Sequence, residues 1–177
     1  MTENVTNLTH EKKTQPLSTE ASLKAQRRLK VARIASVPEA FLSVTKNFEN
    51  FKDLGFDVDL ICSNSEYGQT LRNEFGFNVI TCKISRSISV WNDLISIYKL
   101  TLLFLKNDYD IVHSNTPKAG FITCLAGILS FRKVRLHTFT GQRWITLENP
   151  LKTIMKWLDK VIIRLNTCCY ADSNSQI

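Results

Sequence analysis

Two short polar turns hold many of the side chains in this chain that could do chemistry. The first, His113-Ser114-Asn115-Thr116, follows an apolar run, and the second, Thr140-Gly141-Gln142, comes shortly after His137. Imidazole, hydroxyl and amide groups hydrogen-bond the hydroxyls and phosphates of ligands, and an imidazole also transfers protons near neutral pH. A histidine at this place can equally be a satisfied residue of the core, so both interpretations of His137 stay open from these residues alone.

The segments around these turns predict a strand, a helix and a second strand. Tyr109–Val112 is apolar, Pro117 opens a helix of small and apolar residues that ends near Arg132, and Val134–Phe139 has the pattern of the next strand. When two parallel strands are joined by a crossover helix, both turns lie at the carboxyl edge of the sheet, where open α/β folds bind their ligands. We therefore predict a binding site at this edge.

The start of the helix between the two turns is a candidate anion site. Thr116 suits the N-cap position, Pro117 suits the first helical position, and Lys118 adds a positive charge. The amides at a helix start attract phosphate groups because they lack partners within the helix. A simple cap beside a solvated Lys118 is an equally good interpretation of these residues.

Strands and helices alternate along the rest of the chain. Residues 1–28 are polar and lack apolar periodicity, which predicts a mobile tail before a folded domain at 29–177. Strands are predicted at 30–37, 56–62, 77–84, 109–112, 134–139 and 168–171, and helices at 39–54, 66–75, 90–106, 117–132 and 150–166. This alternation predicts an α/β fold, namely a Rossmann-like parallel sheet with helices on both faces.

The net charge of +7 favours an anionic partner such as a phosphate ligand, a membrane surface or a nucleic acid. No recognition motif for nucleic acid accompanies the charge, so we expect no nucleic-acid partner. One predicted helix carries a basic stripe at i, i+4 spacing, which suits anionic lipid headgroups or is simply a solvated face. The stripe, which lies near Trp144 and Trp157, consists of Lys152, Lys156, Lys160 and Arg164.

The cysteines and the hydropathy of the chain indicate the cellular compartment in which the protein works. The chain has five cysteines with apolar neighbours and no pair at metal-binding spacing, which fits reduced thiols of a cytosolic core. The start of the chain lacks a signal-peptide pattern, and no apolar run is convincing as a membrane span. We expect a cytoplasmic protein, peripheral on the inner face of the plasma membrane if the basic stripe binds lipid.

From Val31 onwards the chain resembles the N-terminal domain of family 4-type glycosyltransferases, which have the two-domain GT-B architecture. The similarity is greatest to bacterial enzymes that extend lipid-linked polysaccharides and oligosaccharides. Each matching segment is short, but their order and spacing agree. The segments are Ser36-Val37-Pro38, Leu54-Gly55-Phe56-Asp57-Val58, Ser85-Arg86 with Asp93, Tyr109-Asp110-Ile111-Val112-His113, Thr116-Pro117-Lys118-Ala119-Gly120, His137-Thr138-Phe139-Thr140-Gly141-Gln142 and Ala171-Asp172-Ser173.

This resemblance implies an enzyme that transfers a hexosyl or N-acetylhexosaminyl group from a nucleotide-sugar to a lipid-linked saccharide on a polyprenyl carrier. The C-terminal domain that binds the donor in the family is absent from these residues. We therefore expect a partial chain that is inactive without such a domain. The alternative is a non-catalytic acceptor- or membrane-binding subunit of a split glycosyltransferase, working with a separate donor-binding polypeptide.

With the resemblance, the candidate site residues take on roles. His137 is the predicted catalytic residue. The predicted acceptor-binding residues are Arg86, His113, Thr116, Lys118, Gly120 and Gln142, and the predicted donor-side contacts are Ser36 and Gly141.

We expect neither a metal ion nor another cofactor, because in the family basic residues of the donor-binding domain usually neutralise the donor diphosphate. Asp57-Val58-Asp59 and Asp108-Tyr109-Asp110 both spell the DxD metal motif of a different glycosyltransferase architecture. Both lie towards the edge of the sheet opposite the predicted site. Glu66 and Glu74 have the spacing of the family's paired glutamates but fall in the wrong domain, so we interpret all three matches as chance.

Overall fold

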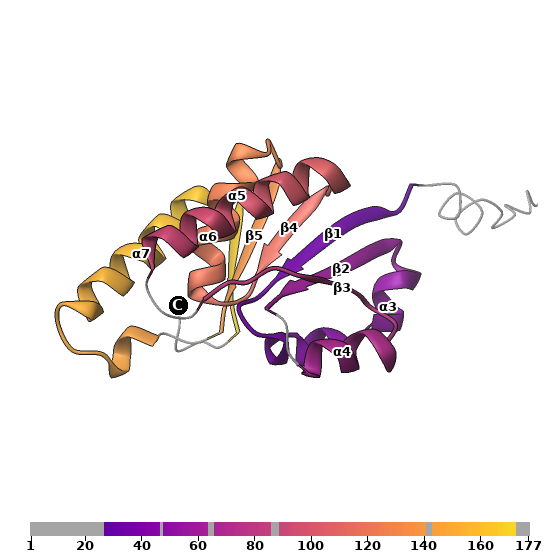
Figure 1. The fold of residues 1–177 in the computed structure, drawn as a ribbon, viewed down its shortest axis with the longest axis horizontal. Helices are drawn as coiled ribbons and strands as arrows, with labels where there is room; N and C mark the ends of the chain where they lie inside the picture. The colour runs from indigo at the N-terminus through magenta and orange to yellow at the C-terminus, as the bar shows by residue number, and fades with distance from the viewer. Residues whose placement is uncertain (1–26, 47, 64–65, 86–88, 141–142, 173–177) are drawn as a thin grey trace, which may run out of the picture.

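The computed structural model describes residues 27–46, 48–63, 66–85, 89–140 and 143–172 (Figure 1). They form a sheet of six strands in the order β3-β2-β1-β4-β5-β6, and every neighbouring pair is parallel. The strands are β1 (Leu29–Ile34), β2 (Phe56–Cys62), β3 (Asn78–Thr81), β4 (Ile111–Ser114), β5 (Val134–Phe139) and β6 (Cys168–Ala171). The predicted Rossmann-like α/β fold is confirmed.

Helices pack on both faces of this sheet (Figure 1). One face carries η1 (Pro38–Phe41), α2 (Leu42–Thr45), α3 (Phe48–Asp53) and α4 (Glu66–Asn73). The other carries α5 (Val90–Asn107), α6 (Pro117–Leu129) and α7 (Leu151–Leu165), and the short helix η2 (Arg143–Thr146) lies before α7. None of the described helices combines the length and the apolarity that crossing a bilayer requires.

Alternation along the strands divides the core into two clusters. Ala32, Ile34 and Val112 are buried in the cluster beneath α5 and α6. Val31 and Leu60 are buried in the second cluster, on the face covered by η1 and α4. Because successive strand residues point to opposite faces, the parity of a residue's position decides which layer of helices it meets.

The structure departs from the predicted elements most at the first helix. The helix predicted at 39–54 is wrong as a single element, since the chain forms η1, α2 and α3 there. Val44 and Thr45 are β-branched, so local helix propensity is low where the predicted helix divides. Strands β1 and β3 are shorter than predicted, whereas β2, β5 and β6 have the predicted bounds.

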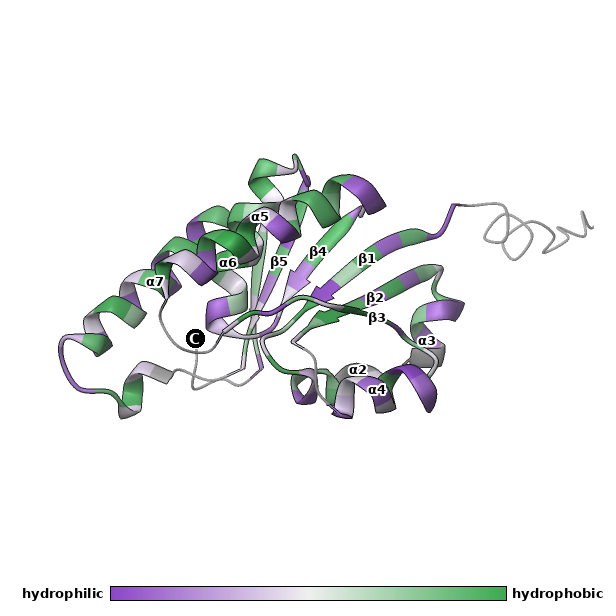
Figure 2. Ribbon diagram, in the orientation of Figure 1, coloured by the Kyte–Doolittle hydropathy of each residue, from purple (hydrophilic) through white to green (hydrophobic). Residues whose placement is uncertain are grey.

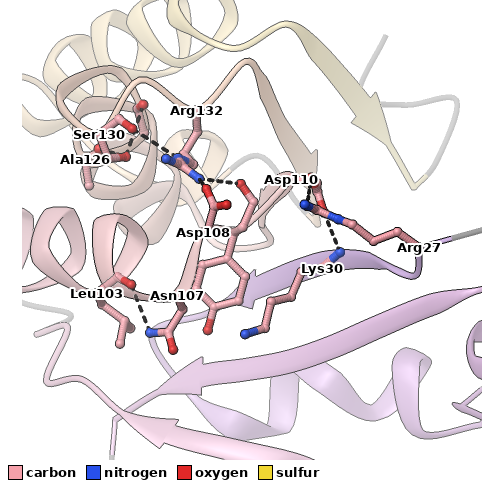
Figure 3. Close-up of polar contacts among 11 residues, drawn as sticks. Arg27, Lys30, Leu103, Asn107, Asp108, Asp110, Ala126, Ser130 and Arg132 are labelled. Atoms are coloured by element: carbon pink, nitrogen blue, oxygen red, sulfur yellow. Dashed lines mark hydrogen bonds and ion pairs between the residues drawn. The ribbon is translucent and has the colours of Figure 1, made fainter.

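Ion pairs stabilise the edge of the sheet at which the strands begin, the amino edge (Figure 3). Asp110 accepts hydrogen bonds from Arg27 at 2.6 Å and from the Lys30 amide at 2.8 Å, and these contacts hold the pKa of its carboxyl below the usual value. Arg132 donates to Asp108 at 2.8 Å and to the Tyr109 carbonyl at 2.9 Å. These carboxylates are engaged in structural contacts far from the carboxyl edge, and Arg27, which we assigned to the tail, takes part in them.

The first DxD match also has a structural role. Asp59 is buried, accepts a hydrogen bond from the Tyr109 hydroxyl at 2.6 Å and accepts another from the Asn78 amide at 2.9 Å. It thus joins β2 to β3 and to the segment before β4. The remainder of the predicted tail, residues 1–26, lies outside the described residues.

All five cysteines are free thiols. Cys62, Cys82 and Cys124 are buried, as a core role predicts. Burial raises the pKa of Cys62 and of Cys124 to about 11, which keeps both thiols protonated at neutral pH. Cys168 is exposed, so the prediction of a core thiol is wrong there, because its position on the edge strand β6 leaves it uncovered.

Candidate functional site

The turns after β1 and β4 lie at the topological switch point of the sheet. These two strands are neighbours, but β1 is followed by η1 on one face and β4 is followed by α6 on the other (Figure 1). Ser36 and Thr116 meet between them: the Ser36 amide donates to Thr116 Oγ1 at 3.3 Å, and the two hydroxyls are hydrogen-bonded at 2.9 Å. A predicted donor-side residue and a predicted acceptor-side residue are thus brought together where such sheets bind ligands.

The start of α6 differs from the simple cap that its sequence suggests. Thr116 has the N-cap backbone conformation, yet its side chain makes no capping hydrogen bond, because its hydroxyl is engaged by Ser36. Lys118 is not a solvated residue: its Nζ lies 2.8 Å from Asp93 Oδ1 of α5, and both side chains are mostly buried. The solvated-lysine interpretation is therefore wrong, and an anion bound at Lys118 would compete with Asp93.

His137 is completely buried in β5, on the face that α6 covers. Its Nδ1 is hydrogen-bonded to Ser114 Oγ at 2.8 Å, and its ring packs edge-on against Phe139 with centroids 4.5 Å apart. Burial lowers its pKa to about 4, so the ring is neutral at physiological pH. Nε2 is buried and has no hydrogen-bond partner within the described part of the chain. The histidine is therefore only half satisfied.

Gly120 makes room for this ring. A Cβ atom at this position would lie 2.6 Å from His137 Cε1 and 3.1 Å from Ile162 Cδ1. Contacts as short as 2.6 Å do not occur, so any larger residue would force the imidazole or α6 to move. The predicted acceptor residue Gly120 is thus a packing partner of the predicted catalytic residue, which its sequence position does not reveal.

The other candidate histidine, His113, lies on the opposite face of the sheet. His113 is paired in register with Leu136, whereas Ser114 is paired with His137, so the two imidazoles point to different helix layers. His113 Nε2 is hydrogen-bonded to Thr138 Oγ1 at 2.8 Å. Burial, together with the nearby Arg33 charge, lowers its pKa to about 3. His113 and His137 therefore cannot act on the same group from one side of the sheet.

Arg33 is a candidate that the sequence interpretation missed. It is the register partner of His113, its Nη2 donates to Asn115 Oδ1 at 3.0 Å, and its Nε is buried without a partner among the described residues. Burial lowers its pKa to about 10, which leaves the guanidinium charged. A cation inside the apolar strand run Val31–Ala35 was the available signal, because such a charge rarely lies in a core strand without a reason.

Three of the predicted site residues cannot be placed. Arg86, Gly141 and Gln142 lie outside the described residues, so their predicted roles stay predictions. Within the described ranges, no group of three or more histidine, cysteine or acidic side chains is arranged to hold a metal ion.

The basic stripe on α7 is divided between two surroundings. Lys156 stacks over the Trp144 ring, with Nζ 4.4 Å from its centroid, and Asp159 accepts a hydrogen bond from the same indole at 3.0 Å. Lys160 and Arg164 are exposed, as is Trp157. Lys156 is exposed as well and Lys152 is half-buried, so most of the stripe is a basic surface, with Trp157 exposed beside it.

Comparison with known proteins decides the family. The model of the glycosyl transferase 4-like family matches residues 30–173. The chain belongs to this family. The predicted resemblance is therefore confirmed, and it covers the whole sheet together with both turns of the candidate site.

Two curated bacterial glycosyltransferases are similar to this chain. The capsular polysaccharide biosynthesis glycosyltransferase CapM of Staphylococcus aureus is 29% identical over 146 residues, which cover 82% of this chain and 38% of CapM. The UDP-Gal:alpha-D-GlcNAc-diphosphoundecaprenol alpha-1,3-galactosyltransferase of Escherichia coli is 29% identical over 115 residues, covering 64% of this chain and 30% of that enzyme. The chain thus spans well under half the length of these relatives.

The fold is also that of a solved glycosyltransferase. Acinetobacter baumannii MurG superimposes with a TM-score of 0.61 at 10% identity, over 84% of this chain and 42% of MurG. At this identity the likeness shows the fold alone. It places the described sheet in a Rossmann-like half of a GT-B architecture.

Proposed function

We propose that this chain is the acceptor-side part of a glycosyltransferase that moves a sugar from a nucleotide-sugar to a lipid-linked saccharide in glycan biosynthesis. The observation that carries the proposal is the family match over residues 30–173. One relative acts, by its name, on a sugar-diphosphoundecaprenol, and another serves capsular polysaccharide biosynthesis. A second polypeptide part that binds the nucleotide would complete the cleft.

In this proposal substrate binding uncovers the buried ring of His137, and its Nε2 then contacts the reacting sugar or the donor phosphate. Ser114 binds the other ring nitrogen, and no partner for Nε2 occurs among the described residues, whereas a core histidine with a purely structural role has both nitrogens hydrogen-bonded. Because its pKa is about 4, the ring acts as a neutral hydrogen-bonding group at physiological pH, and protonated imidazolium is rare there. Ser114 fixes the plane of the ring, as a positioning residue does.

The acceptor diphosphate is proposed to bind at the carboxyl edge near the start of α6. The side chain of Thr116 leaves the N-terminal amides of α6 without a side-chain cap, which favours an anionic guest. Lys118, held by Asp93, and Arg86 would add charge from the flanking segments, and Arg33 is a further guanidinium beneath the same edge. Gln142 would bind a sugar hydroxyl, while Ser36 and Gly141 would face the donor.

Peripheral contact with an anionic membrane is proposed for the basic stripe Lys152, Lys156, Lys160 and Arg164. Exposed Lys160 and Arg164 beside Trp157 support this contact best, because basic and aromatic side chains together suit the headgroup region. We place the protein at the cytoplasmic face of the plasma membrane. We also propose that transfer needs no metal ion, which a chelator added to the assay below would test.

The test is sugar transfer to a polyprenyl diphosphate-linked saccharide. Residues 1–177 would be joined to the donor-binding half of a family member, and transfer of a radiolabelled sugar would be measured with a panel of nucleotide-sugars. We expect transfer by the fusion, none by either half alone, and a loss of about a hundredfold or more with His137→Ala, the usual range for a residue that acts in the transition state. Equal activity of the His137→Ala fusion would contradict the catalytic assignment.

The same assay distinguishes the split-subunit alternative. If the donor-binding half restores transfer when supplied as a separate polypeptide, this chain works as an acceptor-binding subunit. If only the covalent fusion is active, the two halves act as parts of one enzyme.

A further inference from the structure

Arg33 carries a positive charge that no side chain in the described part of the chain neutralises. It is partly buried, its Nη2 donates to the neutral amide of Asn115 at 3.0 Å, and its Nε is buried without a partner among the described residues. It takes part in none of the ion pairs between them. Because an unpaired charge is costly to bury, a buried guanidinium is normally matched by an anion. Arg33 therefore calls for an anionic partner.

The undescribed residues contain few carboxylates that could serve as this partner. Three glutamates lie among residues 1–26, which precede β1. The short undescribed segments further along the chain include no aspartate or glutamate, and these segments are 47, 64–65, 86–88, 141–142 and 173–177. A bound ligand is the better source of the anion, because Asn115, which Arg33 contacts, follows β4 at the edge where such sheets bind ligands.

Arg33 belongs to a row of side chains on one face of the sheet. It is in register with His113, and Thr138 is in register with Tyr170. His113 Nε2 is hydrogen-bonded to Thr138 Oγ1 at 2.8 Å, and the rings of His113 and Tyr170 have centroids 6.3 Å apart. In Figure 2 hydrophilic colouring appears near the carboxyl ends of β1 and β4, which are neighbours in the sheet. By the alternation of strand residues, this row points away from His137 and α6.

The groups in this row suit a saccharide. Tyr170 is 50% exposed, so its ring offers a flat apolar surface to the C–H face of a sugar, and the neighbouring imidazole and hydroxyl groups offer hydrogen bonds. From β1 to β6 the row crosses three strand spacings, about 14 Å, which is long enough for more than one sugar unit. A saccharide that packs on Tyr170 can therefore reach Arg33.

A sugar carboxylate matches Arg33 better than a diphosphate does. Burial and the Arg33 charge lower the pKa of His113 to about 3, so the imidazole is neutral and Arg33 is the one charged side chain of the row. A carboxylate has a single charge and two coplanar oxygens, which fit the planar fork of one guanidinium. A diphosphate carries more charge than one guanidinium neutralises, and Lys118 lies on the other face of the sheet, paired with Asp93.

We propose that Arg33 binds the carboxylate of an acidic sugar, a hexuronate, in the acceptor saccharide. Asn115 holds the guanidinium in position, and Tyr170 packs against a sugar ring. The inference rests on the proposed function of this chain as the acceptor side of a glycosyltransferase, and it names the class of acceptor. Arg33 is then a residue that determines specificity, separate from the predicted catalytic residue His137.

Binding of two matched saccharides to residues 1–177 tests the proposal. Titration calorimetry in detergent would compare a polyprenyl diphosphate-linked disaccharide that ends in glucuronate with one that ends in glucose. We expect the acidic saccharide to bind about tenfold or more tightly, and Arg33→Gln to remove this preference while the neutral saccharide binds within about twofold of the parent. Arg33→Lys keeps the charge without the fork and should retain part of the preference.

The matched control is Lys133→Gln, which removes one positive charge at an exposed position before β5. It should leave both affinities unchanged. Equal binding of the two saccharides by the parent chain would overturn the proposal. So would an equal loss of both affinities in Arg33→Gln, since this is the result that a purely structural role of Arg33 predicts.

The salt dependence of binding gives a test that needs no variant. Raising the salt concentration should weaken the complex with the acidic saccharide more than the complex with the neutral one, because the diphosphate is common to both and the carboxylate is not. An equal salt dependence of the two complexes would overturn the proposal. Thermal unfolding accompanies these measurements, and Arg33→Gln should unfold at or above the temperature of the parent because it removes an unpaired buried charge.

Transfer by the fusion with a donor-binding half separates this inference from the proposed function. The fusion should prefer the acceptor that ends in glucuronate, and Arg33→Gln should lose that preference. A preference that appears only between UDP-glucuronate and UDP-glucose would assign the carboxylate to the donor and overturn the proposal. Transfer without any preference would contradict this inference alone, whereas binding of the acidic saccharide that depends on Arg33, without transfer, would contradict the proposed function alone.

Discussion

His137 shows how burial sets the state of a single residue. Its ring has no exposed surface, one nitrogen is held by Ser114, and the pKa falls to about 4 from a usual 6.5. The position next to a polar turn was visible in the sequence. The burial was not, because it depends on α6 and α7 packing over β5 from elsewhere in the chain.

This burial makes a prediction about pH. Between pH 6.5 and about pH 4 the unfolded chain binds a proton at His137 and the folded chain does not, so the free energy of unfolding should fall as the pH is lowered through this range. The total loss from this ring is about 3 kcal/mol, and above pH 6.5 the ring contributes no pH dependence. His113, with a pKa of about 3, acts in the same direction.

Urea unfolding at a series of pH values measures this effect. His137→Gln should be less stable at neutral pH but should show a shallower fall of the unfolding free energy between pH 6 and pH 5. An unchanged slope in the variant would show that His137 is exposed to protonation in the folded state.

Some further features of single residues could be predicted from the sequence, and others required the structure. The alternation of strand residues could have placed His113 and His137 on opposite faces, but only with the register between β4 and β5, which pairs His113 with Leu136. Arg33 stood out as a charge in an apolar strand. Its contact with Asn115, by contrast, joins residues far apart in the chain and needed the fold.

At the scale of elements, α6 and β5 depend on each other through Gly120. Replacing a helical glycine by alanine normally stabilises a helix by about 0.5–1 kcal/mol. Here the added Cβ would lie 2.6 Å from the His137 ring, so we expect Gly120→Ala to destabilise the protein by about 1–3 kcal/mol. Thermal and urea unfolding measure the difference.

The control for Gly120→Ala is the same change in a His137→Ala background. Removing the ring removes the main clash, so the alanine should then cost much less or stabilise the helix. If the cost is the same in both backgrounds, α6 does not pack on His137 in the way described.

The predicted boundaries of helices and strands were most accurate where the hydrophobic pattern ended at a glycine or a proline. Gly55 before β2 and Pro117 at the start of α6 fixed boundaries that the structure keeps. The helix predicted at 39–54 was wrong as a single element, because apolar periodicity alone cannot show where a segment divides into shorter helices.

At the scale of the whole molecule, the order of strands brings the candidate residues Ser36 and Thr116 together at the carboxyl edge of the sheet. A binding edge at the carboxyl ends of the strands followed from the predicted alternation of strands and helices, whereas the strand order that puts the switch point between β1 and β4 needed the structure. The ion pairs of Asp108 and Asp110 hold the opposite edge, so their carboxylates serve the fold (Figure 3). We therefore propose that this chain forms one wall of a cleft, the wall for the acceptor.

The most direct test of this assignment is equilibrium binding of the two substrates to the chain alone. Titration calorimetry in detergent would compare a polyprenyl diphosphate-linked saccharide with a set of nucleotide-sugars. We predict measurable binding of the lipid-linked saccharide, weakened by about tenfold or more in Gly120→Ala through displacement of His137 and the start of α6, and no measurable binding of any nucleotide-sugar. Binding of a nucleotide-sugar without binding of the lipid-linked saccharide would contradict the account.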